Sequence, residues 1–333
     1  MNSTSTRSET EIQLRGLPNI AVNPIPKFKR QDIHIWDRLF SWSLKIISLT
    51  FPAVLALIGI YLFREAAPAI DKFGWSFLTD SIWDPVNEVF GAAPVIFGTI
   101  VSSMIAVILA APLSLGVALF LNEIVPQKIA RIISFLVEML AAIPSVVYGL
   151  WGIFVLAPWV RTHAQPFLEK WLGFLPLFRG PHYGVGMLTA GVILAIMITP
   201  TIFALSREVF NSIPTTNREA ALALGATRWE MMKIAILKGA KSGIGGAIIL
   251  GLGRALGETM AVTMVIGNRA QISASLFDPS QTMASVIANE YAEATSKMHL
   301  SALIEVGFVL FAVTFIMNSL ARAFLLKGES PHK

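Results

Sequence analysis

The chain has 333 residues, of which 54% are hydrophobic and only 14% are charged. A soluble domain carries about 25% charged residues, so this chain lacks the polar surface that an ordinary globular protein shows to water. The net charge is +5 and cysteine is absent, which excludes disulfides, thiolate metal sites and cysteine nucleophiles. The composition therefore predicts a polytopic membrane protein.

Six apolar stretches are long enough to cross a hydrocarbon core, which needs about 20 helical residues. Because a helix satisfies its own backbone hydrogen bonds in lipid, we expect an all-α protein with six transmembrane helices. The predicted spans are residues 44–63, 93–121, 132–157, 185–205, 243–267 and 302–326.

The distribution of Lys and Arg predicts the orientation in the membrane. With the N-terminus inside, 18 of the 26 cations lie on the cytoplasmic side, seven lie outside, and Arg254 lies within a span. An excess of cations in short loops marks the cytoplasmic side, so we expect both termini in the cytoplasm. This placement also argues against nucleic acid as the partner of the basic residues.

Two parts of the chain differ in composition. Residues 1–36 are expected to form a mobile cytoplasmic tail, because residues 1–30 are rich in Ser, Thr, Asn and Pro. The first apolar run begins too late and is too long for a signal peptide. Residues 37–328 are expected to form one transmembrane domain, with a cytoplasmic loop at 206–242.

The loop at 206–242 carries helix-end signals. Two Thr-x-x-Glu patterns are typical of capping boxes, namely Thr216 with Glu219 and Thr227 with Glu230. Gly225 lies between them, where a helix would end in a left-handed residue. The loop therefore predicts a short helix at about 217–224, a turn, and a second helix that leads from Arg228 into the fifth span.

The short helix has two interpretations. It could be a rigid plug for a groove of a partner, with Ala220, Ala221 and Ala223 allowing close approach while Arg218 and Glu219 orient it. It could also be an elbow that merely connects two spans.

Arg254 and Glu258 stand out inside the fifth predicted span. They lie four residues apart, so a continuous helix would place them on one face. A charge at the bilayer centre costs about 2.5–3.5 kcal/mol on insertion scales, so both should face protein or water. They could form an ion pair that locks helix packing, or a charged element of an anion path.

The chemistry of the two side chains fits the anion path. Arg presents a planar fork that matches phosphate oxygens, and a nearby carboxylate that competes for it would aid release. Monohydrogen phosphate could also donate a hydrogen bond to Glu258, whereas sulfate has no proton to donate.

Other residues in the spans favour structural roles. Gly253 and Gly257 form a small-xxx-small pair that predicts close helix contact. Pro112, Pro144 and Pro200 are predicted to kink the second, third and fourth spans, while Glu138 and Glu305 are expected at the membrane interface. The five histidines lie outside the spans at unrelated spacings, so no metal site is expected.

Glu219-Ala220-Ala221, followed by three residues and then Gly225, resembles the EAA loop of permease subunits of ATP-binding-cassette importers. In that family the loop forms the coupling helix that docks on the ATPase subunit. The resemblance implies that the coupling residues are Thr216, Arg218, Glu219, Ala220, Ala221 and Gly225. Leu237 matches the family's Leu, but Ala235 and Lys238 stand where the family usually has Ile and Pro. We therefore expect a less kinked helix before the fifth span.

Further segments resemble the PstC-type permeases of phosphate-specific importers, over about residues 37–326. They are Asp37-Arg-Leu-Phe40, Ile143-Pro-Ser-Val-Val-Tyr-Gly-Leu-Trp151, Ser206-Arg-Glu-Val209, Leu250-Gly-Leu-Gly-Arg-Ala-Leu-Gly-Glu-Thr-Met-Ala-Val262 and Ile287-Ala-Asn-Glu290. The resemblance implies a type I, MetI-like importer fold in the cell inner membrane and a transport role for Arg254 and Glu258. It also implies three partners: a second, A-type permease subunit, a dimer of ATPase subunits and an extracytoplasmic phosphate-binding protein.

The sequence thus predicts a permease subunit of a phosphate importer that works by alternating access. It contains no P-loop, so ATP and Mg would bind to the partner ATPases, and this chain would be neither an enzyme nor a cofactor protein.

A sulfate or molybdate permease would share the EAA loop but should lack the segment around Arg254 and Glu258. An ion-coupled secondary transporter would use Glu258 as a proton carrier. An intramembrane enzyme would need a nucleophile or metal ligands, and the predicted spans contain no His, Cys or Asp.

Overall fold

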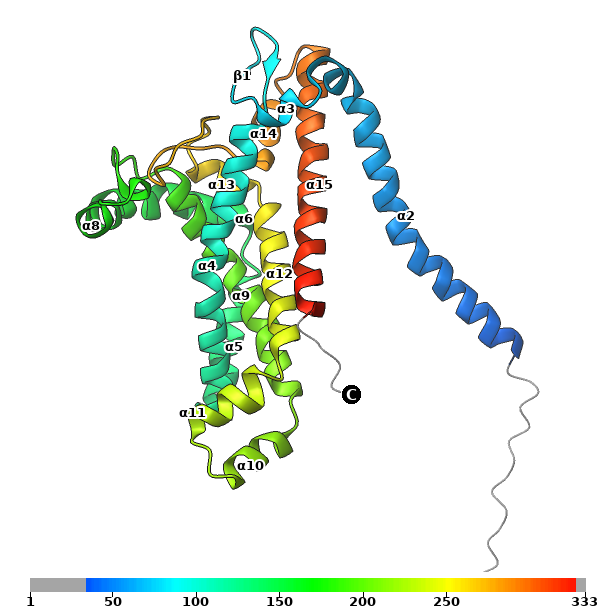
Figure 1. Cartoon of the computed structure of the whole chain (residues 1–333), viewed down its shortest axis with the longest axis vertical. Helices are drawn as coiled ribbons and strands as arrows, with labels where there is room; N and C mark the ends of the chain where they lie inside the picture. The colour runs from blue at the N-terminus through cyan, green and yellow to red at the C-terminus, as the bar shows by residue number, and fades with distance from the viewer. Residues whose placement is uncertain (1–33, 328–333) are drawn as a thin grey trace, which may run out of the picture. The chain divides into compact units, whose positions relative to one another are not determined.

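The computed structural model of the chain describes residues 34–327. They belong to two compact units, one ending at Leu57 and the other beginning at Ile58. The first contains the N-terminal part of helix α2 (His34–Phe73), and the second contains the rest of α2 and all other elements (Figure 1). Apart from its last three positions, the predicted tail at 1–36 lies outside the described residues.

The second unit is almost wholly helical (Figure 1). Its long helices are α4 (Ala93–Glu123), α5 (Gln127–Leu140), α9 (Met187–Ser212), α12 (Lys241–Leu256) and α15 (Lys297–Lys327). The shorter α-helices are α3 (Ser76–Thr79), α6 (Ser145–Trp151), α7 (Ala157–Trp159), α8 (Gln165–Leu172), α10 (Thr215–Ala223), α11 (Arg228–Met231), α13 (Met260–Val265) and α14 (Met283–Glu290). The π-helical segments are η2 (Gly152–Leu156), η3 (Val160–Ala164) and η5 (Met232–Leu237), and η4 (Pro176–Phe178) is a 3-10 turn. Strands β1 (Trp83–Asp84) and β2 (Val89–Phe90) form an antiparallel hairpin.

Five helical stretches of the described chain are long and apolar enough to cross a membrane. They are Asp37–Phe73, Ala93–Glu123, Ser145–Leu172, Met187–Ser212 and Lys297–Leu320. The pair Arg228–Leu237 and Lys241–Leu256 makes a sixth if the two helices count as one span. The prediction of an all-α, multi-pass membrane protein is confirmed, and the bent span is the fifth in chain order.

Helices α4 and α9 run side by side through the centre of the second unit (Figure 1). Alanines of α4 pack with isoleucines of α9 in a buried cluster that includes Ala106, Ala110, Ile193 and Ile198. Close approach is possible because α9 carries Gly191, where a Cβ would lie 2.5 Å from the Ile105 side chain. Small residues that let backbones approach are the usual means of helix association in lipid, where the hydrophobic effect between helices is weak.

Smaller clusters lie toward the two ends of this bundle. At the hairpin end, which carries β1 and β2, Phe90 packs with residues of α14 and α15, and Glu290 accepts hydrogen bonds from Trp83 (2.8 Å) and pairs with His299 (3.0 Å). The opposite end carries α10 and is called the α10 end below (Figure 1). There Phe210 and Ile236 are fully buried. The long helices therefore hold the hairpin and α10 at opposite ends.

The third predicted span, 132–157, is wrong in its bounds. Helix α5 ends at Leu140, and a new helical stretch begins after Pro144 and runs on to Leu172. Proline lacks the N–H that would continue α5, and it disfavours helical dihedrals in the preceding residue. The expected kink at Pro144 is thus a complete break. By contrast, α4 and α9 continue through Pro112 and Pro200 as single helices.

Glu305 lies eight residues after the start of α15 and is only 5% exposed, so it is packed among the helices of the bundle. Its expected place at the membrane interface concerns depth in the bilayer and stays a prediction.

Candidate functional site

The loop that resembles the EAA loop folds as expected in outline. The predicted helix at 217–224 is α10 (Thr215–Ala223), and Gly225 follows it with φ +84°. A Cβ at Gly225 would meet no atom within 4 Å, so the left-handed backbone, and not crowding, is what requires glycine there.

Only one of the two predicted capping boxes forms. Thr227 accepts a hydrogen bond from the Glu230 N–H (3.3 Å), and the Glu230 carboxylate accepts from the Thr227 N–H (2.8 Å). The box at Thr216 and Glu219 is wrong, because Pro214 occupies the N-cap and Thr216 already lies inside the helix. Proline pre-sets an extended conformation at the cap, which begins the helix two residues earlier than expected.

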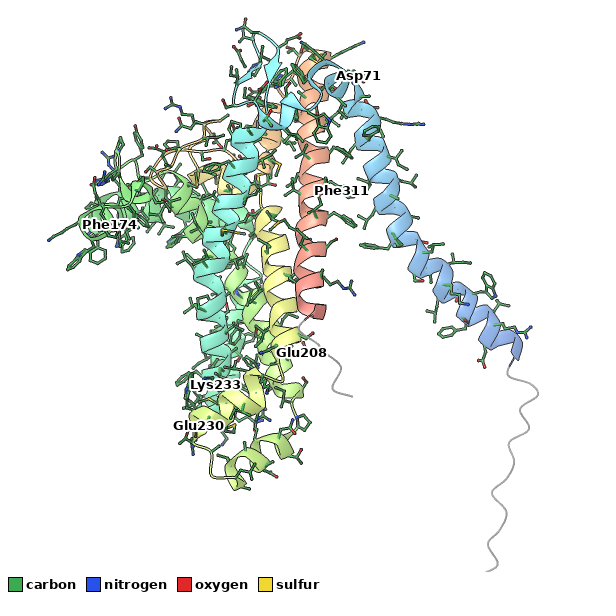
Figure 2. The ribbon with its side chains drawn as sticks, viewed as in Figure 1. Asp71, Phe174, Glu208, Glu230, Lys233 and Phe311 are labelled. Atoms are coloured by element: carbon green, nitrogen blue, oxygen red, sulfur yellow. The ribbon has the colours of Figure 1, made fainter. Side chains whose placement is uncertain are left out.

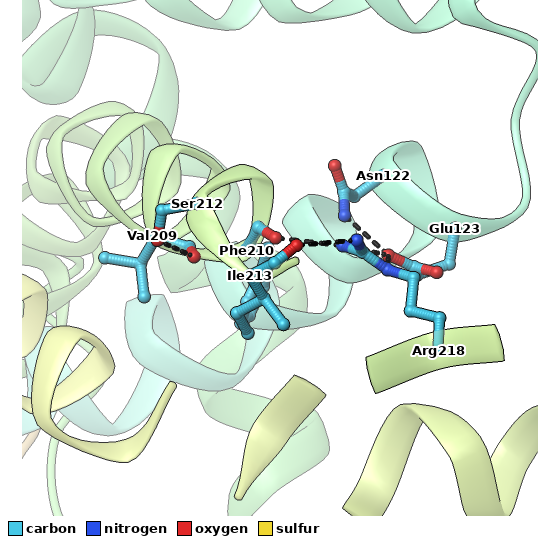
Figure 3. A network of polar contacts seen from close by, with 7 residues as sticks. All are labelled: Asn122, Glu123, Val209, Phe210, Ser212, Ile213 and Arg218. Atoms are coloured by element: carbon cyan, nitrogen blue, oxygen red, sulfur yellow. Dashed lines mark hydrogen bonds and ion pairs between the residues drawn. The ribbon is translucent and has the colours of Figure 1, made fainter. Parts of the chain in front are cut away.

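Arg218 anchors α10 to two other helices (Figure 3). Its guanidinium pairs with Glu123 at the end of α4 (Nη2 to Oε1, 3.1 Å). It also donates to the carbonyls of Phe210 and Ile213 at the end of α9, both at 2.9 Å. These carbonyls belong to the last turn of α9, where a helix has no partners of its own. Arg218 and Glu123 are largely buried, with side chains 17% and 9% exposed, so Arg218 faces inward.

The opposite face of α10 is open. Glu219 and Ala220 are exposed, and two large apolar side chains near them are unusually accessible, with Leu224 at 89% and Trp229 at 62%. Sequence analysis did not single out Leu224 or Trp229, although large apolar residues in a polar loop are a signal for a docking surface.

The helix before the fifth span is strongly kinked, contrary to expectation. Helix α11 continues as η5 and breaks at residues 238–240, so Arg228–Leu237 and Lys241–Leu256 differ in direction by 72°. The absence of proline at Lys238 does not straighten it, because η5 already departs from α-helical pitch and Gly239 is a poor helix former. Glu230 and Lys233 lie on this segment at the α10 end (Figure 2).

Arg254 and Glu258 do not share a helix face. Helix α12 ends at Leu256, and Glu258 lies in the break before α13, where its carboxylate accepts a hydrogen bond from the Ala261 N–H (3.3 Å). Gly257 caps α12, and its low helix propensity explains the break. Among the described residues, no ion pair joins Arg254 to Glu258. The packing role expected for such a pair is therefore wrong.

Arg254 instead points toward α9 and a groove. Its Nη1 donates to the Thr201 hydroxyl at 3.0 Å, and the side chain is half-buried. The groove has a volume of about 820 Å³ and lies between α9, α12 and α15. It is lined by Thr201, Ser242, Gly246, Ile249, Leu250, Gly253, Arg254, Asn318 and Arg322. We call it the Arg254 groove; no carboxylate of the described residues lines it.

Different glycines from those expected make the close helix contacts of α12. A Cβ at Gly243 would lie 2.5 Å from Val209, and one at Gly251 would lie 2.7 Å from Ile202, both on α9. A Cβ at Gly253 would lie 3.5 Å from the Asn318 Oδ1, and a Cβ at Gly257 would approach only the carbonyl of Gly253, at 3.7 Å. Both are ordinary contacts, so the pair Gly253 and Gly257 makes no unusually close helix contact.

Comparison with known proteins identifies the family. Residues 110–326 match the model of the binding-protein-dependent transport system inner membrane component. The chain is 43% identical to the phosphate transport system permease protein PstC of Mesorhizobium japonicum, over 88% of this chain and 91% of the relative. It is 44% identical to the PstC of Pasteurella multocida, over 90% and 95% of the two chains, and 45% identical to that of Haemophilus influenzae, over 88% and 94%.

Solved structures share the fold. A chain of the MetNI methionine ABC transporter in an inward-facing conformation matches with a TM-score of 0.54 at 16% identity, covering 75% of this chain and 100% of that one. A chain of a bacterial alginate ABC transporter matches with a TM-score of 0.57 at 14% identity, over 86% and 95%. The chain belongs to the family of binding-protein-dependent transport system inner membrane components and, within it, to the PstC permeases.

Proposed function

We propose that this chain is a permease subunit of an ATP-driven importer of inorganic phosphate. Its relatives with 43–45% identity are named phosphate transport system permease proteins, and they align along nearly their whole length. Sulfate, molybdate and ion-coupled anion transport are the alternatives that the experiment below separates.

The observation that carries the proposal is Arg254 in its groove. The Arg254 guanidinium donates a hydrogen bond to the neutral Thr201 hydroxyl at 3.0 Å. Because this partner carries no charge, the positive charge of Arg254 is not neutralised and can attract an anion. A guanidinium binds the oxygens of a tetrahedral anion in a bidentate way and keeps its proton at any physiological pH. The groove, of about 820 Å³, is large enough for a hydrated oxyanion.

The partners follow from the family. A second, A-type permease subunit would pair with this chain, and a phosphate-loaded binding protein would dock at the hairpin end, outside the cell. A dimer of ATPase subunits would bind ATP and Mg and dock on the open face of α10, with Leu224 and Trp229 as apolar anchors. Both termini and the α10 end would then lie in the cytoplasm, as the excess of Lys and Arg predicts.

A continuous set of contacts would link the ATPases to Arg254. Arg218 ties α10 to the last turn of α9. The same helix carries Thr201, which holds Arg254. Movement of α10 on ATP binding would therefore tilt α9 and displace the groove, as alternating access requires.

Uptake of radiolabelled phosphate tests the proposal in cells that lack this chain. Wild type should restore ATP-dependent uptake, whereas Arg254→Gln, at equal membrane levels, should not. Lys128→Gln is the matched control, since Lys128 is an exposed cation of α5 outside the groove. Restoration of sulfate or molybdate uptake alone would favour another oxyanion. Uptake that survives ATP depletion while a proton gradient remains would favour an ion-coupled transporter.

A further inference from the structure

The Arg254 groove contains a second cation, Arg322. Asn318 and Arg322 lie one helical turn apart on α15, and both line the groove opposite α12. Side chains four residues apart share a helix face, so the amide and the guanidinium form one polar strip.

The two arginines lie at different depths. Asn318 is level with the turn that carries Arg254, because a Cβ at the neighbouring Gly253 would lie 3.5 Å from the Asn318 Oδ1. Helix α15 descends from the hairpin end, so Arg322 lies about 6 Å farther toward the α10 end. The groove also reaches Ser242, at the first turn of α12, which confirms that it extends in that direction.

The two arginines of the groove have no carboxylate among the lining residues to neutralise them. Elsewhere in the bundle, Arg218 pairs with Glu123 at 3.1 Å and Arg207 with Glu138 at 3.8 Å. The lining of the Arg254 groove offers two guanidiniums and the neutral groups of Thr201, Ser242 and Asn318. Arg254 is half-buried and Arg322 is exposed. Two like charges that line one groove raise each other's free energy, and a dianion between them would offset this repulsion.

The groove leaves room for such an ion. A Cβ at Gly246 would meet no atom within 4 Å, so the groove is open along this turn of α12. Amide and hydroxyl groups can donate to or accept from the oxygens of a partly protonated oxyanion. The space, the charge and the hydrogen-bonding groups therefore all fit a small tetrahedral anion.

We propose that Arg322 and Asn318 form a second binding position for the transported oxyanion, one helical turn from Arg254 toward the α10 end. The anion passes from Arg254 to Arg322 on its way to the cytoplasm. Because a single tight site would trap the ion, two neighbouring sites of moderate strength speed its release. This inference rests on the proposed function, and it adds residues that act after Arg254.

The test uses the complete transporter in proteoliposomes, with phosphate-loaded binding protein outside and ATP inside. Arg322→Gln should lower the maximal rate of phosphate import about tenfold, the effect of losing one charged hydrogen bond. The concentration of loaded binding protein that gives half the maximal rate should not change. Arg322→Lys, which keeps the charge, should restore most of the rate, and Asn318→Ala should reduce it less than Arg322→Gln does.

Lys128→Gln is the control, because Lys128 is an exposed cation of α5 outside the groove and should import at the wild-type rate. An Arg322→Gln transporter with the wild-type rate would overturn the second binding position. Loss of the second permease from the purified Arg322→Gln complex would also overturn it, since Arg322 would then hold the partner subunit. Failure of the wild-type transporter to import phosphate would instead overturn the proposed function.

Discussion

Replacing Arg218 by Met should detach α10 from the bundle and uncouple ATP hydrolysis from transport. Met retains most of the length of the side chain but loses the ion pair with Glu123 and both hydrogen bonds to the end of α9. It also leaves the Glu123 carboxylate, which is only 9% exposed, without its cation. Breaking such a pair by removing one partner costs about 3–5 kcal/mol.

The lower bound already has a measurable consequence. A loss of about 3 kcal/mol raises the population of locally detached α10 roughly a hundredfold. Hydrogen exchange of the α10 amides should accelerate by that factor in the isolated permease pair. In the complete transporter, more ATP should be hydrolysed for each phosphate imported.

Two further variants sharpen this test. Lys128→Met removes an exposed cation of α5 and should leave both measurements unchanged. Glu123→Gln combined with Arg218→Met should be less destabilising than the sum of the two single changes, because the carboxylate is then no longer left unpaired. Wild-type exchange and coupling in Arg218→Met would refute the assignment of Arg218 as the anchor.

Three other changes probe separate parts of the chain. Glu258→Gln keeps an oxygen that can accept a hydrogen bond from the Ala261 N–H but removes the negative charge. Sulfate should then be excluded less strongly from transport. Unchanged exclusion of sulfate in competition uptake would show that Glu258 does not discriminate between sulfate and phosphate. Gly225→Ala should cost about 1–2 kcal/mol, because φ +84° is unfavourable for alanine although the space is open; faster hydrogen exchange at the turn would report it. Gly243→Ala should destabilise the bundle by about 1–3 kcal/mol, because the new Cβ would lie 2.5 Å from Val209. Gly246→Ala should not, because a Cβ there meets no atom within 4 Å. Equal thermal unfolding midpoints of the two variants in detergent would contradict the packing of α12 on α9.

Features that depend on neighbours in the sequence could be predicted. The capping box at Thr227 and the left-handed turn at Gly225 follow from hydrogen bonds and steric limits within a few residues. The spans follow from composition averaged over about 20 residues. The partners of Arg218 could not be predicted, because Glu123 is 95 residues away and meets Arg218 only after α4 and α9 have packed.

The break in the fifth span shows why the candidate site itself was only half predicted. Gly257, Glu258 and Thr259 interrupt the helix in a segment whose mean hydropathy is still that of a span. In an unbroken helix Glu258 would lie beside Arg254 and neutralise it. The break turns the carboxylate to the start of α13 and leaves Arg254 with the neutral Thr201 hydroxyl, in a groove that also contains Arg322. The local backbone, which hydropathy cannot report, therefore decides whether this arginine is half of an ion pair or a binding group for an anion.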